Sequence, residues 1–317
     1  MCNRNIKFGA MLEAVSKLGI EYDYFCTGHY AKIVRPDTGI FGTEERPCMI
    51  SGATDVSKDQ TYFIYRVPSS ILEKVRFPLS ELKKSEVFEL AKKANLEAAN
   101  REESQDFVGE EYRDALFADK PSVPGDIIDL DGHVLGRHRG IEYYTIGQRK
   151  GLGVALNYPV YVHSIDAKNN LVVLAKNEDL DSSAVIADDF VWPAGVEPSE
   201  EIEAMVKIRL ASRPVLCKVS RYVPEKNIDE TVGKNTCHAE LDRHAELDLA
   251  SDCCSDEIPK QVRDDAGVIG RDDTRFTGQP WLIKFAEPQR AVAPGQSAVL
   301  YKDGVIIGGG IIAKAVK

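Results

Sequence analysis

Apolar residues recur at helical spacing near the start of the chain. Five of them share one face of a predicted helix over residues 7–18: Phe8, Met11, Leu12, Val15 and Leu18. Gly19 follows, where a glycine commonly ends a helix. A second amphipathic pattern predicts a helix over residues 83–95. Both helices are expected to belong to a domain in which helices pack against a sheet.

Between these helices, residues 22–33, YDYFCTGHYAKI, are expected to form a buried strand that ends in a turn of small residues. α/β sheets bind ligands at the carboxyl ends of their strands. Thr27, Gly28 and His29 are therefore predicted to lie at an edge where a site forms, directly after Cys26.

From about residue 108 the pattern changes to short, alternating β-type runs separated by Gly and Asp-Gly turns. Residues 158–175 predict a hairpin that turns at Asn169 and Asn170. The later strands follow one another at the short spacing of a barrel. We therefore predict an α/β domain over residues 1–107, a small central β domain over 108–183 and a C-terminal β-barrel over 184–317.

One acidic segment interrupts the predicted barrel between two strands. Residues 237–273 contain 11 acidic and four basic residues, repeat HAELD at His238 and His244, and have no aromatic residue. The segment resembles translated dispersed palindromic repeats, and we predict a disordered insertion. A zinc-type alternative would use Cys237, His238, His244, Cys253 and Cys254. Adjacent cysteines lack the usual C-x-x-C spacing, so no metal site is predicted.

Composition limits the cellular context. The 317 residues are 43% hydrophobic and include no apolar run of 18 residues and no signal-peptide pattern, so a cytoplasmic protein without membrane contact is expected. The odd number of cysteines, seven, favours reduced thiols. The net charge of −10 comes mostly from the acidic insertion, so a local basic surface is compatible with the sequence.

Several strings in order resemble the tRNA-specific 2-thiouridylase family across essentially the whole chain outside the insertion: CNRNIKFG, TGHYAKI, SKDQTYFIY, PGDIIDLDGHVLGRHRGIEYYTIGQRKGLG and FAEPQRAVAPGQSAVLY. The resemblance implies 2-thiolation of the wobble uridine of tRNA, with tRNA and a sulfur-relay donor protein as partners. It also implies ATP with Mg²⁺, which activates the uracil carbonyl before a persulfide sulfur replaces the oxygen.

The family begins with an SGGVDSS-like loop that holds the ATP phosphates, and this string is not found in the sequence. We therefore expect residues 1–107 to be the remnant of an adenine-nucleotide-binding domain, with Met1 an internal methionine of a longer frame. An alternative from another functional class is a non-catalytic tRNA-binding fragment that has lost ATP chemistry.

The resemblance makes Cys2 the catalytic nucleophile. A thiolate needs positive surroundings, which a helix N-terminus, Arg4 and Lys7 would supply. The family's second cysteine is missing from residues 102–111, EESQDFVGEE. Cys26 is then a candidate sulfur relay or, with Cys2, a ligand of an iron–sulfur cluster. The alternative for Cys26 is a small buried strand residue.

Further roles carry over by the same resemblance. Gly28 would lie against the nucleotide, and seven residues would contact tRNA: His29, Lys58, Asp59, Gln60, Arg209, Leu210 and Gln296. Leu210 stands where the family often has tyrosine. The alternatives are a locally satisfied histidine at position 29 and an ordinary solvated turn at residues 58–60. The glycine-rich loop at residues 146–153 would fold over substrate or form a plain hairpin turn.

Overall fold

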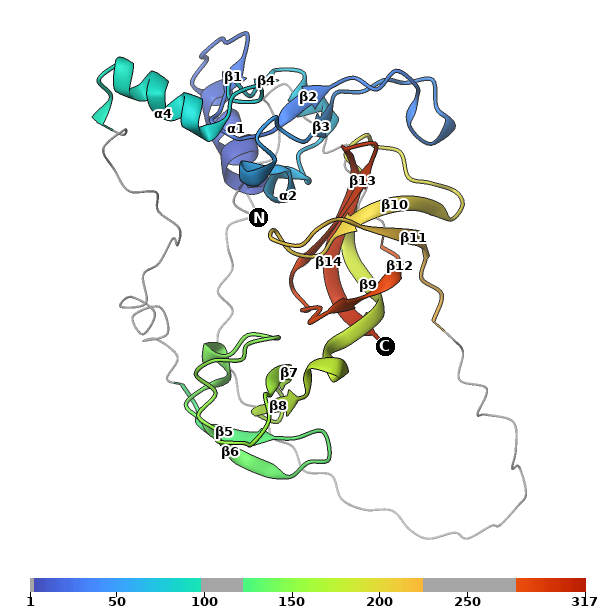
Figure 1. Cartoon of the computed structure of the whole chain (residues 1–317). Coiled ribbons are helices and arrows are strands. Elements are labelled where there is room, and N and C mark those ends of the chain that lie inside the picture. Colours follow the sequence, from blue (N-terminus) through green and yellow to red (C-terminus); the bar gives the residue numbers. More distant parts are fainter. Residues whose placement is uncertain (1–2, 98–121, 225–277) are drawn as a thin grey trace, which may run out of the picture. The chain divides into compact units, whose positions relative to one another are not determined.

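A computed structural model describes residues 3–97, 122–224 and 278–317 (Figure 1). All of these except Val223 and Pro224 belong to one compact unit. Its elements form a small parallel pair of strands, a four-stranded sheet and an eight-stranded sheet that includes a barrel. The predicted combination of an α/β part, a central β domain and a C-terminal β-barrel is confirmed, whereas the exact domain boundaries stay predictions.

The first predicted helix is present. A π-helical segment, Asn3–Ala10, runs into α1, Met11–Lys17, and Gly19 follows with a φ of 68°. Of the predicted apolar face, Phe8 is buried, but Met11 and Leu18 are 40% and 74% exposed. The Phe8 ring packs edge-on against the ring of Phe25, a strand residue, at 5.9 Å between centroids, so the predicted packing of this helix on a sheet is present at Phe8, whereas Met11 and Leu18 lie outside it.

The predicted long strand is also shorter than expected. Residues 22–33 form β1, Phe25–Cys26, and then β2 begins, Lys32–Val34. The remaining elements of this part are η2 Ile40–Gly42, β3 Met49–Ser51, η3 Val56–Lys58, α2 Thr61–Ile64, α3 Ser69–Leu72, β4 Val75–Arg76 and α4 Lys84–Lys93. β1 and β4 pair in parallel, so their carboxyl ends meet at one edge. α4 confirms the second predicted helix.

The central domain is a four-stranded sheet with the order β6-β5-β8-β7. Its elements are β5 Gly125–Ile128, β6 Val134–His138, η5 Ile141–Tyr143, β7 Tyr161–Asp166 and β8 Leu171–Ala175. β5 and β8 are parallel, whereas the other neighbours are antiparallel. Asn170 turns the β7–β8 hairpin with a φ of 55°, so the predicted hairpin is confirmed.

Six antiparallel strands close the C-terminal barrel in the order β13-β10-β11-β12-β9-β14, and β14 pairs back to β13. After η6, Asn177–Leu180, they are β9 Asp181–Val191, β10 Ile202–Lys207, β11 Val215–Arg221, β12 Trp281–Arg290, β13 Ser297–Lys302 and β14 Val305–Val316. Arg221 on β11 lies opposite Trp281 on β12. The acidic insertion therefore falls within a hairpin connection, but residues 237–273 lie outside the described residues.

The α/β part and the barrel share one sheet and one core. The β2–β3 hairpin extends the barrel sheet because Ser51 on β3 pairs with Val305 on β14. Phe8 from the N-terminal segment and Tyr65 pack in the same buried cluster as Ile306. These two parts therefore share one buried apolar cluster.

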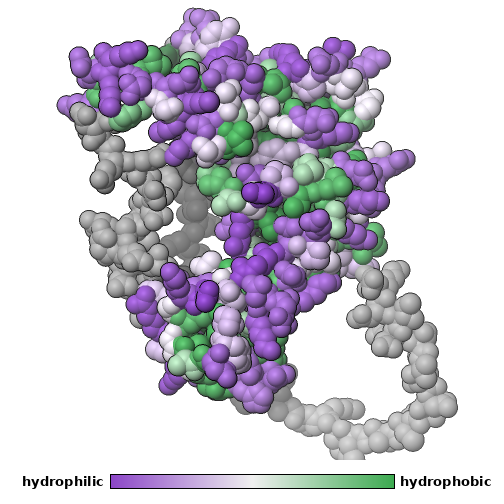
Figure 2. Space-filling model, viewed as in Figure 1, coloured by the Kyte–Doolittle hydropathy of each residue, from purple (hydrophilic) through white to green (hydrophobic). Residues whose placement is uncertain are grey.

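The surface is predominantly polar on the face seen in Figure 2, where apolar residues form small separate groups. Among the described residues, Leu18, Tyr24 and Phe88 are large side chains at least two-fifths exposed. None of the helices described here has the length and apolar character needed to cross a membrane.

Candidate functional site

Gly28 is exposed to solvent at the sheet edge that follows β1. Thr27 continues the pairing with β4, because its amide donates to the carbonyl of Arg76 at 3.1 Å. Gly28 is exposed, and a methyl group added to it would first meet Leu79 at 3.7 Å, an ordinary contact distance. A ligand can therefore approach the backbone here, although no steric reason within the described residues demands glycine.

His29 points into the protein rather than toward solvent. It is 7% exposed and lies 5.9 Å from the Phe8 ring and 5.8 Å from the Phe77 ring, measured between centroids. Its Nδ1 is 2.8 Å from the hydroxyl oxygen of Thr27. Burial, with a smaller contribution from the charge of Lys7, lowers the pKa of His29 to about 4. The geometry fits the locally satisfied histidine, while its tRNA contact stays a prediction.

The Lys58–Gln60 segment is held by its own side chains. The carboxylate of Asp59 accepts hydrogen bonds from the backbone amides of Thr61 and Ala53, at 3.1 and 3.3 Å. Gln60 pairs with Tyr30 in both directions: the Gln60 amide donates to the Tyr30 carbonyl at 2.9 Å, and Gln60 Oε1 accepts from the Tyr30 amide at 3.0 Å. These bonds join the segment to the edge that carries Gly28.

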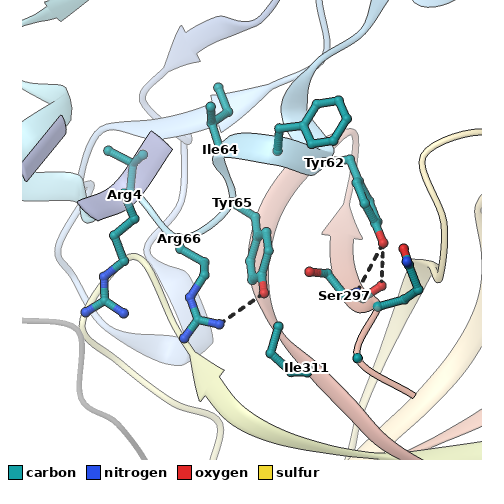
Figure 3. A pocket seen from close by; sticks show the side chains of 11 residues that line it. Arg4, Tyr62, Ile64, Tyr65, Arg66, Ser297 and Ile311 are labelled. Carbon is teal, nitrogen blue, oxygen red and sulfur yellow. Dashed lines mark hydrogen bonds between the residues drawn. The ribbon is translucent and has the colours of Figure 1, made fainter. Parts of the chain in front are cut away.

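Helix α2 continues from this segment into the barrel. The hydroxyl of Tyr62 donates to the carbonyl of Ser297 at 2.9 Å and accepts from its amide at 3.2 Å (Figure 3). The hydroxyls of Thr61 and Tyr301 lie 3.1 Å apart. Burial raises the pKa of Tyr62, which keeps this phenol protonated in both contacts. α2 therefore links the α/β edge to strand β13 of the barrel.

Arg66 anchors the other end of this link to β9. Its Nη2 donates to the carbonyl of Asp189 at 3.1 Å and lies 2.6 Å from the carboxylate of the same residue. Nη1 donates to the Tyr65 hydroxyl at 3.3 Å. The Arg66 side chain is 5% exposed, and that of Asp189 is 35% exposed. Asp189 has a φ of 45°, which turns both of its oxygen acceptors toward one guanidinium.

A pocket of about 210 Å³ opens beside these contacts (Figure 3). It is lined from the N-terminal segment, from α2 and the residues after it, and from the barrel by Arg4, Tyr62, Phe63, Ile64, Tyr65, Arg66, Val67, Gly295, Gln296, Ser297 and Ile311. The side-chain amide of Asn3 donates to the carbonyl of Phe63 at 3.2 Å and holds the N-terminal segment there. The pocket thus brings Gln296, a predicted tRNA contact, next to the segment that follows Cys2.

The two remaining predicted barrel contacts differ in their surroundings. The Arg209 guanidinium donates to the carbonyls of Ile146, at 3.3 Å, and of Ala291, so it joins the central domain to the barrel. Burial lowers the pKa of Arg209, with a further contribution from Arg290. Leu210 is 42% exposed. The Tyr62 hydroxyl lies 3.4 Å from the carbonyl of Ile208, the residue before Arg209, so α2 also contacts this part of the barrel.

The glycine-rich loop of the central domain folds back on itself. Gln148 accepts from the Thr145 amide at 3.0 Å and donates to the Lys150 carbonyl at 2.9 Å. Gly147 approaches the barrel so closely that a methyl group there would lie 2.8 Å from the Ala291 side chain. The loop is a turn docked on the barrel, with Arg149 and Lys150 exposed. Its closure over substrate stays a prediction.

The described cysteines do not gather. Cys26 is exposed on β1, so the alternative that it is a small buried strand residue is wrong. Cys48 and Cys217 are buried, and burial raises the pKa of Cys217 to about 12. Cys2 and the cysteines of the acidic insertion lie outside the described residues. Within the described ranges, the metal-like grouping is Asp129, Asp131 and His133, which contains no cysteine.

Sequence reasoning missed the residues that join the domains. Tyr62, Arg66 and Asp189 were not among the predicted site residues, although the aromatic run directly after KDQ could have drawn attention to the first two. Asp189 gives no local signal, because its role depends on a φ value and on a partner 123 positions away.

Three family profiles match the chain. They are the tRNA methyl transferase HUP domain over residues 1–109, the tRNA methyl transferase PRC-barrel domain over 114–176, and the aminomethyltransferase beta-barrel domain over 274–312. Together with the α/β edge, central sheet and closed barrel, these matches define a multidomain protein of the tRNA-modifying class.

Similar proteins specify the family. The chain is 36% identical to the tRNA-specific 2-thiouridylase MnmA of Endomicrobium trichonymphae over 98% of this chain and 70% of the relative. It is 35% identical to MnmA 1 of Syntrophus aciditrophicus (99% and 67%) and to MnmA of Carboxydothermus hydrogenoformans (99% and 70%). The chain belongs to the tRNA-specific 2-thiouridylase family.

Proposed function

We propose that this protein 2-thiolates the wobble uridine of tRNA. The observation that carries the proposal is the alignment at 36% identity over 98% of the chain with a 2-thiouridylase. The arrangement of the site supports it, because α2 connects the exposed Gly28 edge to the pocket at Gln296. A nucleotide-binding edge and an RNA-binding pocket must communicate in a reaction that uses both ATP and tRNA.

The proposal assigns chemistry to four groups of residues. Gly28 would lie against the ATP, which with Mg²⁺ would supply the adenylyl group that activates the uracil oxygen. Cys2 is the nucleophile, and Cys26 is a candidate sulfur relay because its thiol is exposed. The tRNA is contacted through His29, Lys58, Asp59, Gln60, Arg209, Leu210 and Gln296. For Asp59, Gln60 and Arg209, the internal hydrogen bonds support a positioning contribution as well.

Sulfur replaces the adenylated oxygen in two steps. The terminal sulfur of a persulfide forms a bond to C2 of the uracil, and the C2–O bond breaks as AMP leaves. The thiolate of Cys2 then attacks the donor's inner sulfur, which releases 2-thiouridine and leaves a disulfide for an external thiol to reduce. A sulfur-relay protein and a cytoplasmic location complete the proposal.

The decisive experiment combines the whole chain with tRNA, ATP–Mg²⁺ and a persulfide-loaded donor protein and measures 2-thiouridine by mass spectrometry. Cys2→Ser should abolish thiolation while tRNA binding stays unchanged, and free sulfide should restore part of the product. Cys26→Ala reports whether that exposed thiol relays sulfur. Wild-type protein that binds tRNA but forms no 2-thiouridine would refute the enzymatic proposal and favour a non-catalytic tRNA-binding protein.

A further inference from the structure

The pocket beside α2 has cationic walls. Arg4 and Arg66 both line its volume of about 210 Å³, and no aspartate or glutamate belongs to the lining. Figure 3 shows the two guanidinium groups directed toward the same side. Asp189 balances the charge of Arg66 from outside the lining. The pocket therefore favours an anionic group over a neutral or cationic one.

Arg66 retains hydrogen-bonding capacity in this state. Its Nη atoms bind Asp189 and Tyr65, whereas its buried Nε has no acceptor among the described residues. An unpaired buried donor is costly, so an acceptor that enters with a small side-chain adjustment is favoured. Planar guanidinium groups match the oxygens of phosphate particularly well.

The position of Arg4 links the pocket to the predicted chemistry. Arg4 follows Cys2 by two residues, which span at most about 7 Å of extended chain. Asn3 holds the intervening backbone to Phe63, on the pocket wall. A group bound at Arg4 consequently lies within a nucleotide's length of the Cys2 backbone.

The remaining walls suit a nucleotide more than an isolated ion. Three aromatic residues, Tyr62, Phe63 and Tyr65, are among the lining residues, together with the exposed Gln296. Single-stranded RNA is commonly bound by this combination of cations, aromatic rings and hydrogen-bonding side chains.

We propose that this pocket binds a backbone phosphate of the tRNA nucleotide that is to be modified, with Arg4 as its direct ligand and Arg66 as the buried second cation. The inference rests on the proposed function. It adds Arg4 and Arg66 to the residues for which the family resemblance implies a tRNA contact. Phosphate held at Arg4 orients the attached nucleoside toward the segment that carries Cys2.

The test measures tRNA binding by the whole protein as a function of salt concentration. Arg4→Gln should weaken binding about tenfold at low salt and reduce the slope of log K against log salt by about 0.7, the value for one single-strand phosphate contact. Arg137→Gln is the matched control, because that arginine is 73% exposed and pairs with Asp126. An unchanged affinity and slope in Arg4→Gln would overturn the inference.

Asp189→Asn tests whether Arg66 affects tRNA binding through its charge or only through its contact with β9. This change should lower stability but leave tRNA affinity equal or higher, since it removes negative charge beside the pocket. A loss of tRNA affinity in the folded variant would show that Arg66 acts only by supporting the fold and would overturn its assigned role.

A ligand smaller than tRNA distinguishes failure of the pocket from failure of the proposed function. Saturation-transfer NMR should detect uridine 5′-monophosphate, but not uridine, and Arg4→Gln should abolish the signal. Nucleotide binding through Arg4 without any tRNA binding would support the pocket and refute the proposed function. Thiolation of tRNA with monophosphate binding unaffected by Arg4→Gln would keep the function and overturn the pocket.

Discussion

Asp189→Asn tests how strongly the Arg66–Asp189 ion pair ties α2 to the barrel. Asparagine preserves the size of the side chain and tolerates the positive φ of 45° at this position. The main-chain carbonyl that accepts from Arg66 at 3.1 Å is also retained. The substitution therefore removes the charge and leaves the surrounding geometry intact.

The expected loss follows from the burial of the two partners. Breaking a fully buried ion pair by removing one charge costs about 3–5 kcal/mol. The Asp189 side chain is 35% exposed and asparagine still offers a neutral acceptor, so we expect a loss of about 2 kcal/mol in the free energy of unfolding. Arg66→Met should cost about 3 kcal/mol, because the Asp189 carbonyl and the Tyr65 hydroxyl also lose their donor.

Urea unfolding followed by tryptophan fluorescence provides the assay. The chain has two tryptophans, Trp192 and Trp281, and both are buried in the barrel. Circular dichroism should give a coincident transition if the protein unfolds in one step. In the double variant, the combined loss should fall short of the sum of the single losses by about 1 kcal/mol or more.

The reasoning is refuted if Asp189→Asn changes the free energy of unfolding by less than about 0.5 kcal/mol, the range of ordinary surface substitutions. Exact additivity of the two substitutions would equally contradict a direct interaction. Arg137→Gln serves as the control, since its ion pair with Asp126 is exposed and should contribute little.

Three further results are expected. Burial lowers the pKa of His29 to about 4, so the unfolded state binds more protons than the folded state between pH 6.5 and 4. The free energy of unfolding should therefore decrease by as much as roughly 3 kcal/mol as the pH is lowered from 6.5 to 4. Urea midpoints measured across this range should show the decrease, and His29→Gln should flatten the profile. Iodoacetamide should modify exposed Cys26 in the native protein while sparing buried Cys217, whose pKa is about 12, and equal rates by mass spectrometry would contradict the burial. Gly309→Ala should destabilise the protein by about 1–3 kcal/mol, because the new methyl group would lie 2.7 Å from the Tyr65 ring; an unchanged melting temperature would show that this contact relaxes freely.

Local patterns were sufficient for elements that depend on nearby residues. The helix that ends before Gly19 and the hairpin that turns at Asn170 both follow from side-chain periodicity and from backbone positions with positive φ. The barrel could be predicted as a class because short alternating strands recur. Its closure by β13 and β14 required the structure.

The burial of the first helix and the length of the strand after it could not be predicted from the same patterns. Residues 22–33 contain enough aromatic and aliphatic side chains for one long strand, yet the structure pairs Phe25–Cys26 with β4 and Lys32–Val34 with β3. The chain changes partners at Thr27–His29, and such a change depends on distant strands.

The residues of the candidate site could be predicted from the sequence better than the contacts that connect them. The family resemblance placed Gly28, Gln60 and Gln296 in one function, and the structure connects them through α2. The ion pair that holds α2 against the barrel joins residues 66 and 189, so no local sequence motif predicts it. Contacts across such sequence distances arise from the packing of whole elements.

The pairing of β3 with β14 has a consequence for synthesis on the ribosome. Ser51 is made about 250 residues before its partner Val305, an interval of roughly 12–50 s at ordinary elongation rates. During that interval the β2–β3 hairpin presents an uncovered strand edge, and Tyr65 lacks its contact with Gly309. The amino-terminal part therefore completes its fold only after β14 leaves the exit tunnel, so chains that stall before β14 is made are exposed to chaperones and proteases.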